Sequence, residues 1–364
     1  MKRYLVVGSG LAGATFARLM TDNGNQCFVI DKRSHVGGNV YTENVGGIHV
    51  HKYGCHIFHT SNKGVWDFVN KHASFHHFDY KPKVRYGDDV FSFPINLLTL
   101  QQVYGRVVSP KEAMALFSTN KQDNSNLESW CLSTIGKDLY DIFVKGYTKK
   151  QWGRDPLQLP SSIIRRIPVR FNYNDSYFND TYQGIPTHGY TDMINSMLDG
   201  IDVSLDTSYS DVSLSSFDKV FYTAPIDELL EYRFGHLDYR SLRFSTENIK
   251  GVNDYQGVAV MNHTSYSTPY TRVIEHKHFM RKPPTTHTVV SHEYPVEYDG
   301  SNERYYPVND KRNNEVYLKY QRASKELDNF IFCGRLAEYK YYDMHQVIAS
   351  SMKKAQDEIH SSKV

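Results

Sequence analysis

The chain has 364 residues, with 42 basic and 40 acidic side chains and a formal net charge of +2. This near balance, with no long run of one sign, argues against a face that binds nucleic acid, and no apolar run approaches the roughly 18 residues of a membrane helix. The absence of a C-x-x-C pair and a start that enters a folded pattern directly predict a cytoplasmic protein without a signal peptide.

The first 33 residues predict a β-α-β unit. Apolar residues at 4–7 predict a strand, residues 11–20 have helical periodicity, and residues 27–30 predict a second buried strand. Gly8, Gly10 and Gly13 form a G-x-G-x-x-G pattern, which allows a tight turn, close approach of a pyrophosphate and packing of helix on strand.

Two further features of this unit favour a dinucleotide. The helix that begins at Leu11 offers free N–H groups to phosphates. Asp31, followed by Lys32, ends the second strand, and its carboxylate can accept hydrogen bonds from a ribose, which disfavours a 2′-phosphate there. The alternative is a glycine-rich turn in an ordinary α/β domain.

A second glycine pair narrows the choice of cofactor. Gly37 and Gly38 precede Asn39 soon after the second strand, and adjacent glycines permit positive φ and close backbone approach. This arrangement resembles FAD-binding proteins of the amine oxidase and glutathione reductase type, in which such a segment passes near the flavin. We therefore expect FAD, although periodicity alone does not separate FAD from NAD.

The rest of the chain alternates strand and helix signals. Ser109 followed by Pro110 is a good helix start, and residues 121–126 form a polar loop. Near the end, a strand at 330–333 runs into Gly334, which brings a backbone turn back to the cofactor. Further helices are expected over 62–72 and from His345 to about 359, and strands within 75–96, 202–222 and 255–295.

These elements predict an α/β fold in three parts. A Rossmann-like FAD-binding domain is expected to be discontinuous, with an inserted helical domain and an antiparallel β-sheet domain. The expected boundaries are 1–64, 206–224 and 326–364 for the FAD domain, 65–97, 160–205 and 225–325 for the sheet domain, and 98–159 for the helical domain.

Runs spread over nearly the whole chain resemble the bacterial UDP-galactopyranose mutase family. They include Gly37-Gly38-Asn39, His56-Ile57-Phe58-His59, Gln151-Trp152-Gly153, Arg166-Ile167-Pro168-Val169-Arg170-Phe171 and Arg335-Leu336-Ala337-Glu338-Tyr339. The resemblance implies an isomerase that needs reduced FAD and interconverts UDP-galactopyranose and UDP-galactofuranose without net redox change. It also implies attack of flavin N5 on the anomeric carbon, UDP departure, ring opening through a flavin iminium and reclosure. A homodimer that supplies polysaccharide biosynthesis is implied as well.

The resemblance assigns roles around the nucleotide sugar. Arg166 and Arg272 match two arginines that clamp the diphosphate, a task that suits guanidinium groups; a surface ion pair is the alternative. Tyrosines that hydrogen-bond the same phosphates are matched by Tyr177, Tyr306 and Tyr341. Residues that frame the uracil, close a mobile loop or contact the nucleotide are matched by Phe143, Tyr147, Trp152 and Asn262. Ordinary core packing is the alternative for the aromatic residues.

Other matches lie on the cofactor side. The resemblance places His56 and His59 near the isoalloxazine as candidate catalytic residues, and Arg335 near the FAD diphosphate. It implies that the flavin carries the proton steps, so the histidines need not act as a general acid and base, and that His59 shapes the protein contacts of the flavin. The last helix is expected to approach the flavin at Asp343 and Met344, with Tyr341 close by. A metal site is the rival interpretation of the histidines, but they lack an obvious acidic or cysteine partner nearby, so no metal is expected.

One stretch departs from the family pattern. Where an Asn-Ser-Pro run is expected, this chain has Tyr80-Lys81-Pro82, so a bulkier side chain occupies a substrate-facing position. This leaves dTDP-fucopyranose or UDP-N-acetylgalactosamine open as alternative substrates, although His59 in place of an arginine argues against the N-acetyl sugar. A conventional FAD oxidoreductase and a non-catalytic nucleotide-binding protein are the other classes considered.

Overall fold

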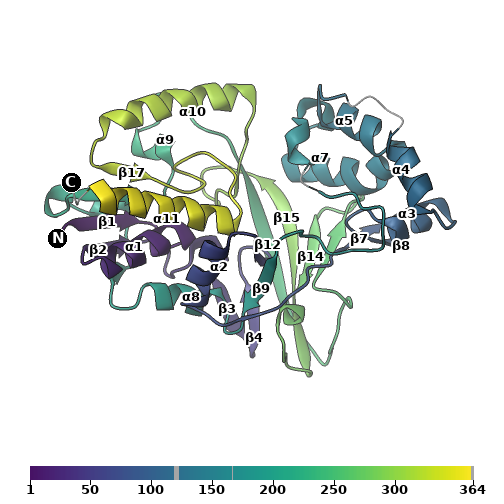
Figure 1. Ribbon diagram of the computed structural model, residues 1–364, viewed down its shortest axis with the longest axis horizontal. Helices are drawn as coiled ribbons and strands as arrows, with labels where there is room; N and C mark the ends of the chain where they lie inside the picture. The colour runs from purple at the N-terminus through teal and green to yellow at the C-terminus, as the bar shows by residue number, and fades with distance from the viewer. Residues whose placement is uncertain (119–122, 166, 362–364) are drawn as a thin grey trace.

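The computed structural model describes residues 1–118, 123–165 and 167–361. Figure 1 shows an N-terminal lobe that contains both chain ends, a central sheet, and a helical lobe on the far side of that sheet. The N-terminal and C-terminal segments lie side by side in the first lobe, as expected for a discontinuous nucleotide-binding domain.

The N-terminal lobe is built on a parallel sheet with strand order β10-β2-β1-β11-β17. The predicted β-α-β unit is present as β1 (Arg3–Val7), α1 (Leu11–Asp22) and β2 (Gln26–Ile30). Strands predicted within 202–222 and at 330–333 join the same sheet. The other strands are β10 (Asp202–Ser204), β11 (Lys219–Tyr222) and β17 (Phe330–Phe332).

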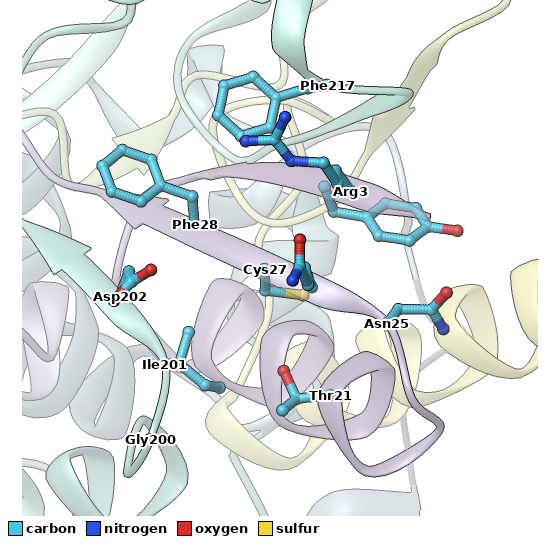
Figure 2. A pocket seen from close by; sticks show the side chains of 11 residues that line it. Arg3, Thr21, Asn25, Cys27, Phe28, Gly200, Ile201, Asp202 and Phe217 are labelled. Atoms are coloured by element: carbon cyan, nitrogen blue, oxygen red, sulfur yellow. The ribbon is translucent and has the colours of Figure 1, made fainter. Parts of the chain in front are cut away.

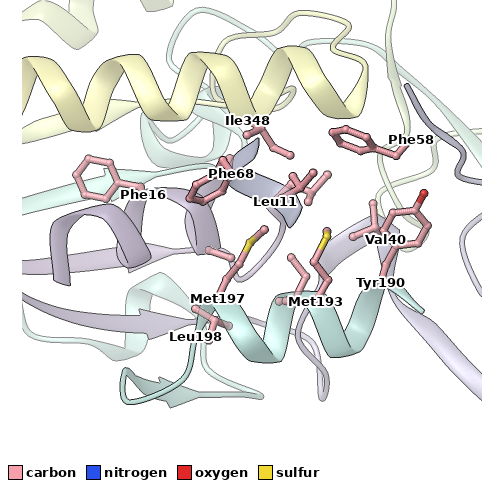
Figure 3. Packing of buried hydrophobic residues seen from close by; sticks show 14 of the residues in the cluster. Leu11, Phe16, Val40, Phe58, Phe68, Tyr190, Met193, Met197, Leu198 and Ile348 are labelled. Carbon is pink, nitrogen blue, oxygen red and sulfur yellow. The ribbon is translucent and has the colours of Figure 1, made fainter. Parts of the chain in front are cut away.

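The core of this lobe lies between α1, α8 (Tyr190–Met197) and α11 (Met344–Ser361). Figure 3 shows Phe16, Met193 and Ile348 converging from these three helices. Phe16 is fully buried and stacks on Phe221 of the sheet, with ring centroids 4.0 Å apart. Burial of one such side chain stabilises the fold by about 1.5–3 kcal/mol, so this core fixes the glycine turn at the start of α1.

The central sheet has the order β16-β12-β15-β14-β13-β7-β8. Its long strands β12 and β15 pair antiparallel from Arg240 opposite Glu297 to Lys250 opposite His287. All its pairs are antiparallel except β13 with β7. The strands are β7 (Lys83–Tyr86), β8 (Asp89–Ser92), β12 (Tyr239–Lys250), β13 (Val260–His263), β14 (Arg272–Glu275), β15 (His287–Glu297) and β16 (Tyr306–Pro307).

The helical lobe spans residues 97–163 within the described ranges. The predicted start at Ser109 is confirmed, because α4 begins at Pro110. The π-helical segment η2 runs directly into α7, and such segments are frequent at functional sites. The elements are α3 (Leu97–Tyr104), α4 (Pro110–Ser118), α5 (Leu127–Thr134), α6 (Lys137–Leu139), η2 (Tyr140–Lys145), α7 (Gly146–Trp152), η3 (Pro156–Gln158) and η4 (Ser161–Ile163). Part of the loop expected at 121–126 lies outside the described residues.

Smaller elements complete the fold. Strands β5, β9 and β6 form a small sheet, and β3 pairs with β4. The short strands and remaining helices are η1 (Gly38–Val40), β3 (Thr42–Val45), β4 (Ile48–His51), β5 (Phe58–Thr60), α2 (Lys63–Asn70), β6 (Phe75–His76), β9 (Tyr182–Pro186), η5 (Tyr209–Asp211), η6 (Leu214–Ser216), α9 (Ile226–Leu229), η7 (His276–Phe279), α10 (Lys311–Ala323) and η8 (Ser324–Glu326).

The predicted fold class is confirmed, with one parallel pair in an otherwise antiparallel central sheet. The expected domain boundaries stay a prediction. Strand β10 pairs with β2 and α8 packs on α1, which associates residues 190–204 with the N-terminal lobe. No helix in the described part of the chain is long and apolar enough to cross a membrane.

Candidate active site

The glycine turn between β1 and α1 is shaped by backbone contacts. Gly8 has φ +103°, and its N–H donates to the Ile30 carbonyl at 2.8 Å. A Cβ on Gly13 would lie 1.9 Å from the Gly8 carbonyl oxygen, so only glycine fits. Gly10 makes no side-chain cap for α1, which leaves N–H groups at the helix start available to an anion.

Two other glycine segments meet this turn. The Gly37 N–H donates to the Ser9 carbonyl at 3.1 Å, and a Cβ on Gly38 would lie 3.1 Å from Gly10 Cα. Gly334 follows β17 with φ +98°, and a Cβ there would contact Ala12 at 3.7 Å. The three segments therefore form one bare backbone surface at the carboxyl end of the sheet, which fits the pyrophosphate of FAD.

Asp31, the acid that follows β2, stabilises the glycine turn through hydrogen bonds. Asp31 Oδ2 accepts from the Ser9 N–H at 2.8 Å and from the Ser9 hydroxyl at 2.6 Å, and Oδ1 accepts from the Arg33 N–H at 3.0 Å. Lys32 is exposed, and Asn39 Oδ1 accepts from Arg33 Nη2. A contact of Asp31 with a ribose stays a prediction.

A half-buried arginine marks the centre of the candidate site. Arg272 on β14 donates from Nε and Nη2 to the Tyr147 hydroxyl at 3.1 and 2.8 Å. Its Nη1 lies 3.5 Å from Oε2 of Glu293, whose side chain is 1% exposed. Burial disfavours the charge, but the Glu293 carboxylate together with Tyr147, Cys55 and Tyr306 outweighs burial and raises the pKa of Arg272 well above its ordinary value. The guanidinium therefore stays charged and fixed.

Tyr306, Tyr341 and Arg335 lie beside this arginine. The rings of Tyr306 and Tyr341 are 6.0 Å apart, and the Arg335 guanidinium carbon lies 4.7 Å from the Tyr341 ring centroid. Arg335 donates from Nε and Nη2 to the Tyr342 carbonyl at 2.9 and 2.6 Å. Burial, followed by the Glu293 carboxylate, raises the pKa of Tyr306, so its hydroxyl stays protonated as a donor.

His56 faces the same cationic cluster. Burial first, and then the charge of Arg335, lower its pKa to about 4. Its Nδ1 lies 2.8 Å from the Gly54 carbonyl oxygen, which can only accept, so Nδ1 carries the proton. His56 is thus a neutral imidazole near neutral pH.

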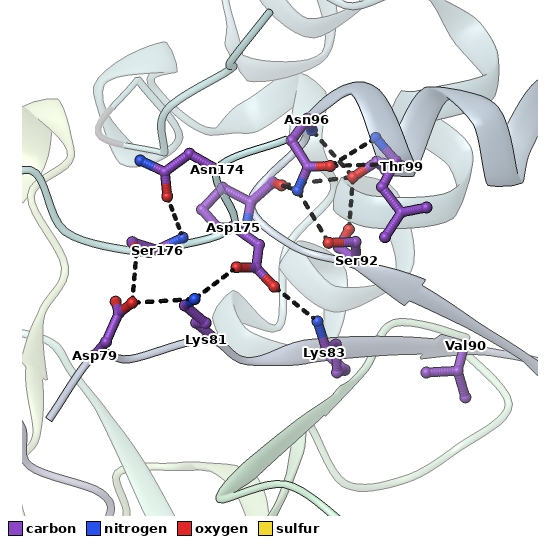
Figure 4. A network of polar contacts seen from close by, with 12 residues as sticks. Asp79, Lys81, Lys83, Val90, Ser92, Asn96, Thr99, Asn174, Asp175 and Ser176 are labelled. Atoms are coloured by element: carbon purple, nitrogen blue, oxygen red, sulfur yellow. Dashed lines mark hydrogen bonds and ion pairs between the residues drawn. The ribbon is translucent and has the colours of Figure 1, made fainter. Parts of the chain in front are cut away.

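Ion pairs hold the chain on both sides of Tyr80, and Figure 4 shows those that join Asp79, Lys81, Lys83 and Asp175. Lys81 Nζ lies 3.1 Å from Asp79 and 3.2 Å from Asp175, and Lys83 Nζ lies 3.0 Å from Asp175. The Tyr177 N–H donates to the Tyr80 carbonyl at 2.8 Å. These contacts fix residues 79–83 against 175–177.

The result is an aromatic wall made by Tyr80, Tyr177 and Phe178. Ring centroids are 5.3 Å apart for Tyr80 and Tyr177 and 5.7 Å apart for Tyr80 and Phe178. The Cys55 thiol lies close enough to Tyr80 and to the Arg272 guanidinium for both to act on its pKa, which burial raises. The wall therefore extends from the cationic cluster toward Phe178, on which the ring of His59 stacks at 3.7 Å.

Three predicted substrate residues have structural partners of their own. Phe143 is buried in the helical lobe, with ring centroids 5.5 Å from Phe91 and 6.0 Å from Phe93. Asn262 Nδ2 donates to the Lys83 carbonyl at 3.2 Å and so joins β13 to β7. Trp152 ends α7 beside a cavity of about 540 Å³. Their roles toward a nucleotide stay predictions.

Of the remaining predicted site residues, Asp343 and Met344 are described by the structure and Arg166 is not. Asp343 and Met344 lie at the start of α11, and the Asp343 carbonyl accepts from the Val347 N–H. Arg166 lies outside the described residues.

A second cavity, of about 440 Å³, is lined by Arg3, Cys27 and Asp202 among others (Figure 2). It lies at the amino ends of β1, β2 and β10, opposite the glycine turn. Burial raises the pKa of the Cys27 thiol to about 11, so the thiol stays protonated and this cavity adds no nucleophile to the site.

The structure adds residues that sequence reasoning missed. Glu293 is the buried partner of Arg272, and because β15 lacks a strict alternation of apolar and polar residues, its sequence does not mark this acid as inward-facing. Asp180 hydrogen-bonds His59, and no sequence pattern around Asp180 predicts this contact. Phe178 joins the wall through its position next to Tyr177.

Comparisons with known proteins agree with this geometry. A family model described as UDP-galactopyranose mutase matches residues 142–341, and a model described as an NAD(P)-binding Rossmann-like domain matches residues 6–72.

Two relatives are similar over their full lengths. A probable UDP-galactopyranose mutase of Klebsiella pneumoniae is 40% identical over 99% of this chain and 95% of its own. A dTDP-fucopyranose mutase of Escherichia coli is 38% identical over all of both chains. The crystal structure of a reduced UDP-galactopyranose mutase shares the fold with a TM-score of 0.80 at 13% identity, covering 99% of this chain and 96% of that one.

Proposed function

This chain belongs to the UDP-galactopyranose mutase family of flavin-dependent nucleotide-sugar mutases, and we propose that it interconverts UDP-galactopyranose and UDP-galactofuranose with reduced FAD. The observation that carries the proposal is the convergence of Arg272, Arg335, Tyr147, Tyr306 and Tyr341 beside the glycine surface. Such a set of fixed donors suits a diphosphate that departs and returns during catalysis.

Reduced FAD, when bound, would supply the nucleophile for the anomeric carbon of the sugar. The residues of the chain have separate tasks around it. The glycine segments and the start of α1 hold the cofactor diphosphate. Arg272, kept charged by Glu293, stabilises the negative charge that develops on the substrate diphosphate as the anomeric C–O bond breaks. Protonated tyrosine hydroxyls donate to the same oxygens.

A second candidate substrate is dTDP-fucopyranose, and Tyr80 favours it. Tyr80 is 8% exposed and packs with Tyr177 and Phe178, so this part of the wall is aromatic. Fucose carries a methyl group where galactose carries a hydroxymethyl group, and an aromatic wall accepts a methyl group without leaving a polar group unpaired.

The direct test uses purified protein with dithionite-reduced FAD, incubated separately with UDP-galactofuranose and dTDP-fucofuranose. Chromatography then follows the pyranose product. Turnover of the UDP sugar only with reduced flavin supports the proposal. Turnover of the dTDP sugar alone would support the mutase activity but replace UDP-galactose by dTDP-fucose as the proposed substrate. FAD binding without turnover of either sugar would count against the assigned site.

A further inference from the structure

Lys150 connects α7 to the hairpin that carries Arg272. Its side chain is buried, and Nζ donates to the carbonyl oxygens of His263, Thr268 and Tyr270 at 2.7, 2.9 and 2.8 Å. These carbonyls belong to the end of β13 and to the loop that leads into β14. Burial lowers the pKa of Lys150 to about 8, so near neutral pH the amine is still an ammonium, and each of its three hydrogens has one carbonyl as partner.

The loop that Lys150 holds joins two residues of the candidate site. Asn262 on β13 and Arg272 on β14 lie opposite each other in the strand register, and residues 264–271 connect the two strands. The base of the loop is closed by the His263 N–H, which donates to the Thr271 carbonyl at 2.8 Å. The loop therefore ends directly at Arg272, and a shift of the loop would shift the guanidinium.

Helix α7 contacts the same arginine through Tyr147. This tyrosine lies three residues before Lys150, so the two side chains lie on one face of the helix. The Tyr147 hydroxyl accepts from Arg272 Nε and Nη2 at 3.1 and 2.8 Å. Gly146 allows the close approach, because a Cβ there would lie 2.2 Å from the Thr264 carbonyl oxygen. The helix and the hairpin are thus joined both at Lys150 and at Tyr147.

We propose that Lys150 is a positioning residue, which holds α7 against the 264–271 loop and thereby fixes Arg272 and Tyr147 relative to each other. The inference rests on the proposed function, in which Arg272 stabilises the charge that develops on the departing nucleotide. The three ammonium hydrogens are committed to carbonyls, so Lys150 has none left for a phosphate and acts through the arginine. Without the ammonium, the three carbonyls lose their donor, and Arg272 loses the fixed placement on which electrostatic stabilisation depends.

The test is Lys150→Met, which keeps an unbranched side chain but removes the ammonium. Free UDP resembles the departing nucleotide, because its terminal phosphate carries the charge that cleavage of the anomeric C–O bond creates. For the FAD-loaded variant we expect UDP to bind ~tenfold more weakly and kcat to fall ~tenfold, a size typical of residues coupled in one hydrogen-bond network, while KM for the nucleotide sugar changes less than about threefold. Calorimetry with UDP, and with dTDP in parallel, gives the affinity, and initial rates per bound FAD give kcat and KM.

Lys149→Met is the matched control. Lys149 is the neighbouring lysine on α7, is exposed, and has its Nζ over the ring of Tyr266 in the same loop, 5.1 Å from the centroid. This variant should keep the wild-type kcat and UDP affinity. Amides of residues 263–268 and 270–272 should exchange hydrogen faster in Lys150→Met than in Lys149→Met. Lys150→Gln, with two N–H donors on a shorter side chain, should lie between the wild type and Lys150→Met in UDP affinity.

A double variant separates positioning from a role in stability alone. Lys150→Met combined with Tyr147→Phe should weaken UDP binding by less than the product of the two single effects, because both changes act on the placement of Arg272. The unfolding midpoint and the FAD content are measured for each variant. A lower midpoint with wild-type UDP affinity and kcat per bound FAD would overturn the inference, and so would fully independent effects in the double variant.

Two outcomes are kept apart from these. If Lys150→Met does not retain FAD, a wild-type UDP affinity in Lys150→Gln would overturn the inference. A wild-type enzyme that binds UDP but turns over no nucleotide sugar would overturn the proposed function, while the UDP affinity of the variants would still measure the effect of Lys150 on the arginine.

Discussion

At the scale of single residues, the site depends on groups whose charge is fixed by a neighbour. Arg272 stays charged because Glu293 faces it, and His56 stays neutral because it is buried beside Arg335. A diphosphate would therefore meet permanent positive charge next to a neutral imidazole. Such preorganised groups need no reorganisation when charge develops on the leaving group.

Tyr80 is expected to decide between the two sugars. Replacement by asparagine supplies a donor and an acceptor for the sugar hydroxymethyl group of galactose, which fucose lacks. We expect Tyr80→Asn to raise the kcat/KM ratio of UDP-galactofuranose over dTDP-fucofuranose by about tenfold, the worth of roughly one hydrogen bond. Initial rates with both sugars on one enzyme preparation give this ratio.

Tyr80→Phe is the matched control, because it keeps the ring against Tyr177 and Phe178 and should leave the ratio near the wild-type value. An unchanged ratio in Tyr80→Asn, or an equal change in both variants, would contradict a role in selectivity.

The roles of residues could be predicted from the sequence where a short motif with fixed spacing determines them. Gly8, Gly10 and Gly13 were identifiable because a turn, a close approach and a packing contact each demand glycine at fixed spacing. Asp180 and Glu293 were not identifiable, because their partners lie 121 and 21 residues away in the chain. Pairing over such distances depends on strand register, which the sequence does not display.

At the scale of elements, the end of α7 is docked onto two neighbours. Arg240 on β12 donates from Nε to the Gln151 carbonyl at 2.9 Å, and Arg154 Nη1 lies 2.7 Å from Asp310 Oδ2. Asp310 also caps α10, since its Oδ1 accepts from the Asn313 N–H. The segment that carries Trp152 is thereby tied across to the N-terminal lobe.

The ion pair at Asp310 should contribute to this docking separately from the cap. Asp310→Asn keeps a good N-cap but loses the charge. The pair is partly exposed, so we expect a loss of less than about 1 kcal/mol, or up to about fivefold faster hydrogen exchange of amides 146–154. High salt should speed this exchange in the wild type and not in the variant.

Asp310→Ala serves as the comparison, because it removes both the cap and the pair and should also speed exchange in the first turn of α10. Equal exchange at α7 in wild type and Asp310→Asn would show that the Arg154–Asp310 pair does not help to hold the segment.

Helices and strands could be predicted only where the segment itself has a recognisable sequence pattern. Helix α4 was anticipated from Ser109 and Pro110. Strand β9 was not, because Tyr-Gln-Gly-Ile-Pro lacks the alternation of a strand and pairs with β5 and β6 through tertiary contact.

At the scale of the whole molecule, buried neutral histidines make the fold sensitive to acid. Burial lowers the pKa of His276 to about 3, and that of His263 to about 4. Between pH 6.5 and these values the unfolded chain binds more protons than the folded chain, so stability falls as the pH falls. For the fully buried His276, a shift of this size corresponds to at most about 5 kcal/mol once the pH lies below the folded-state pKa.

We therefore expect the free energy of unfolding, measured by urea titration, to decrease steadily from pH 7 to pH 4.5. His276→Gln should reduce the slope of stability against pH, whatever its effect at pH 7, while His188→Gln at an exposed position should not. A slope that is identical in wild type and His276→Gln would show that His276 does not contribute.

We propose that this chain moves a sugar ring, with reduced flavin present and no net oxidation. The most direct measurement follows UDP-galactopyranose formation and the flavin absorbance spectrum together, under anaerobic conditions, over many turnovers. We expect product only while FAD is reduced, with a spectrum that stays reduced as product accumulates. Flavin that is oxidised in proportion to product, or equal turnover with oxidised FAD, would contradict it.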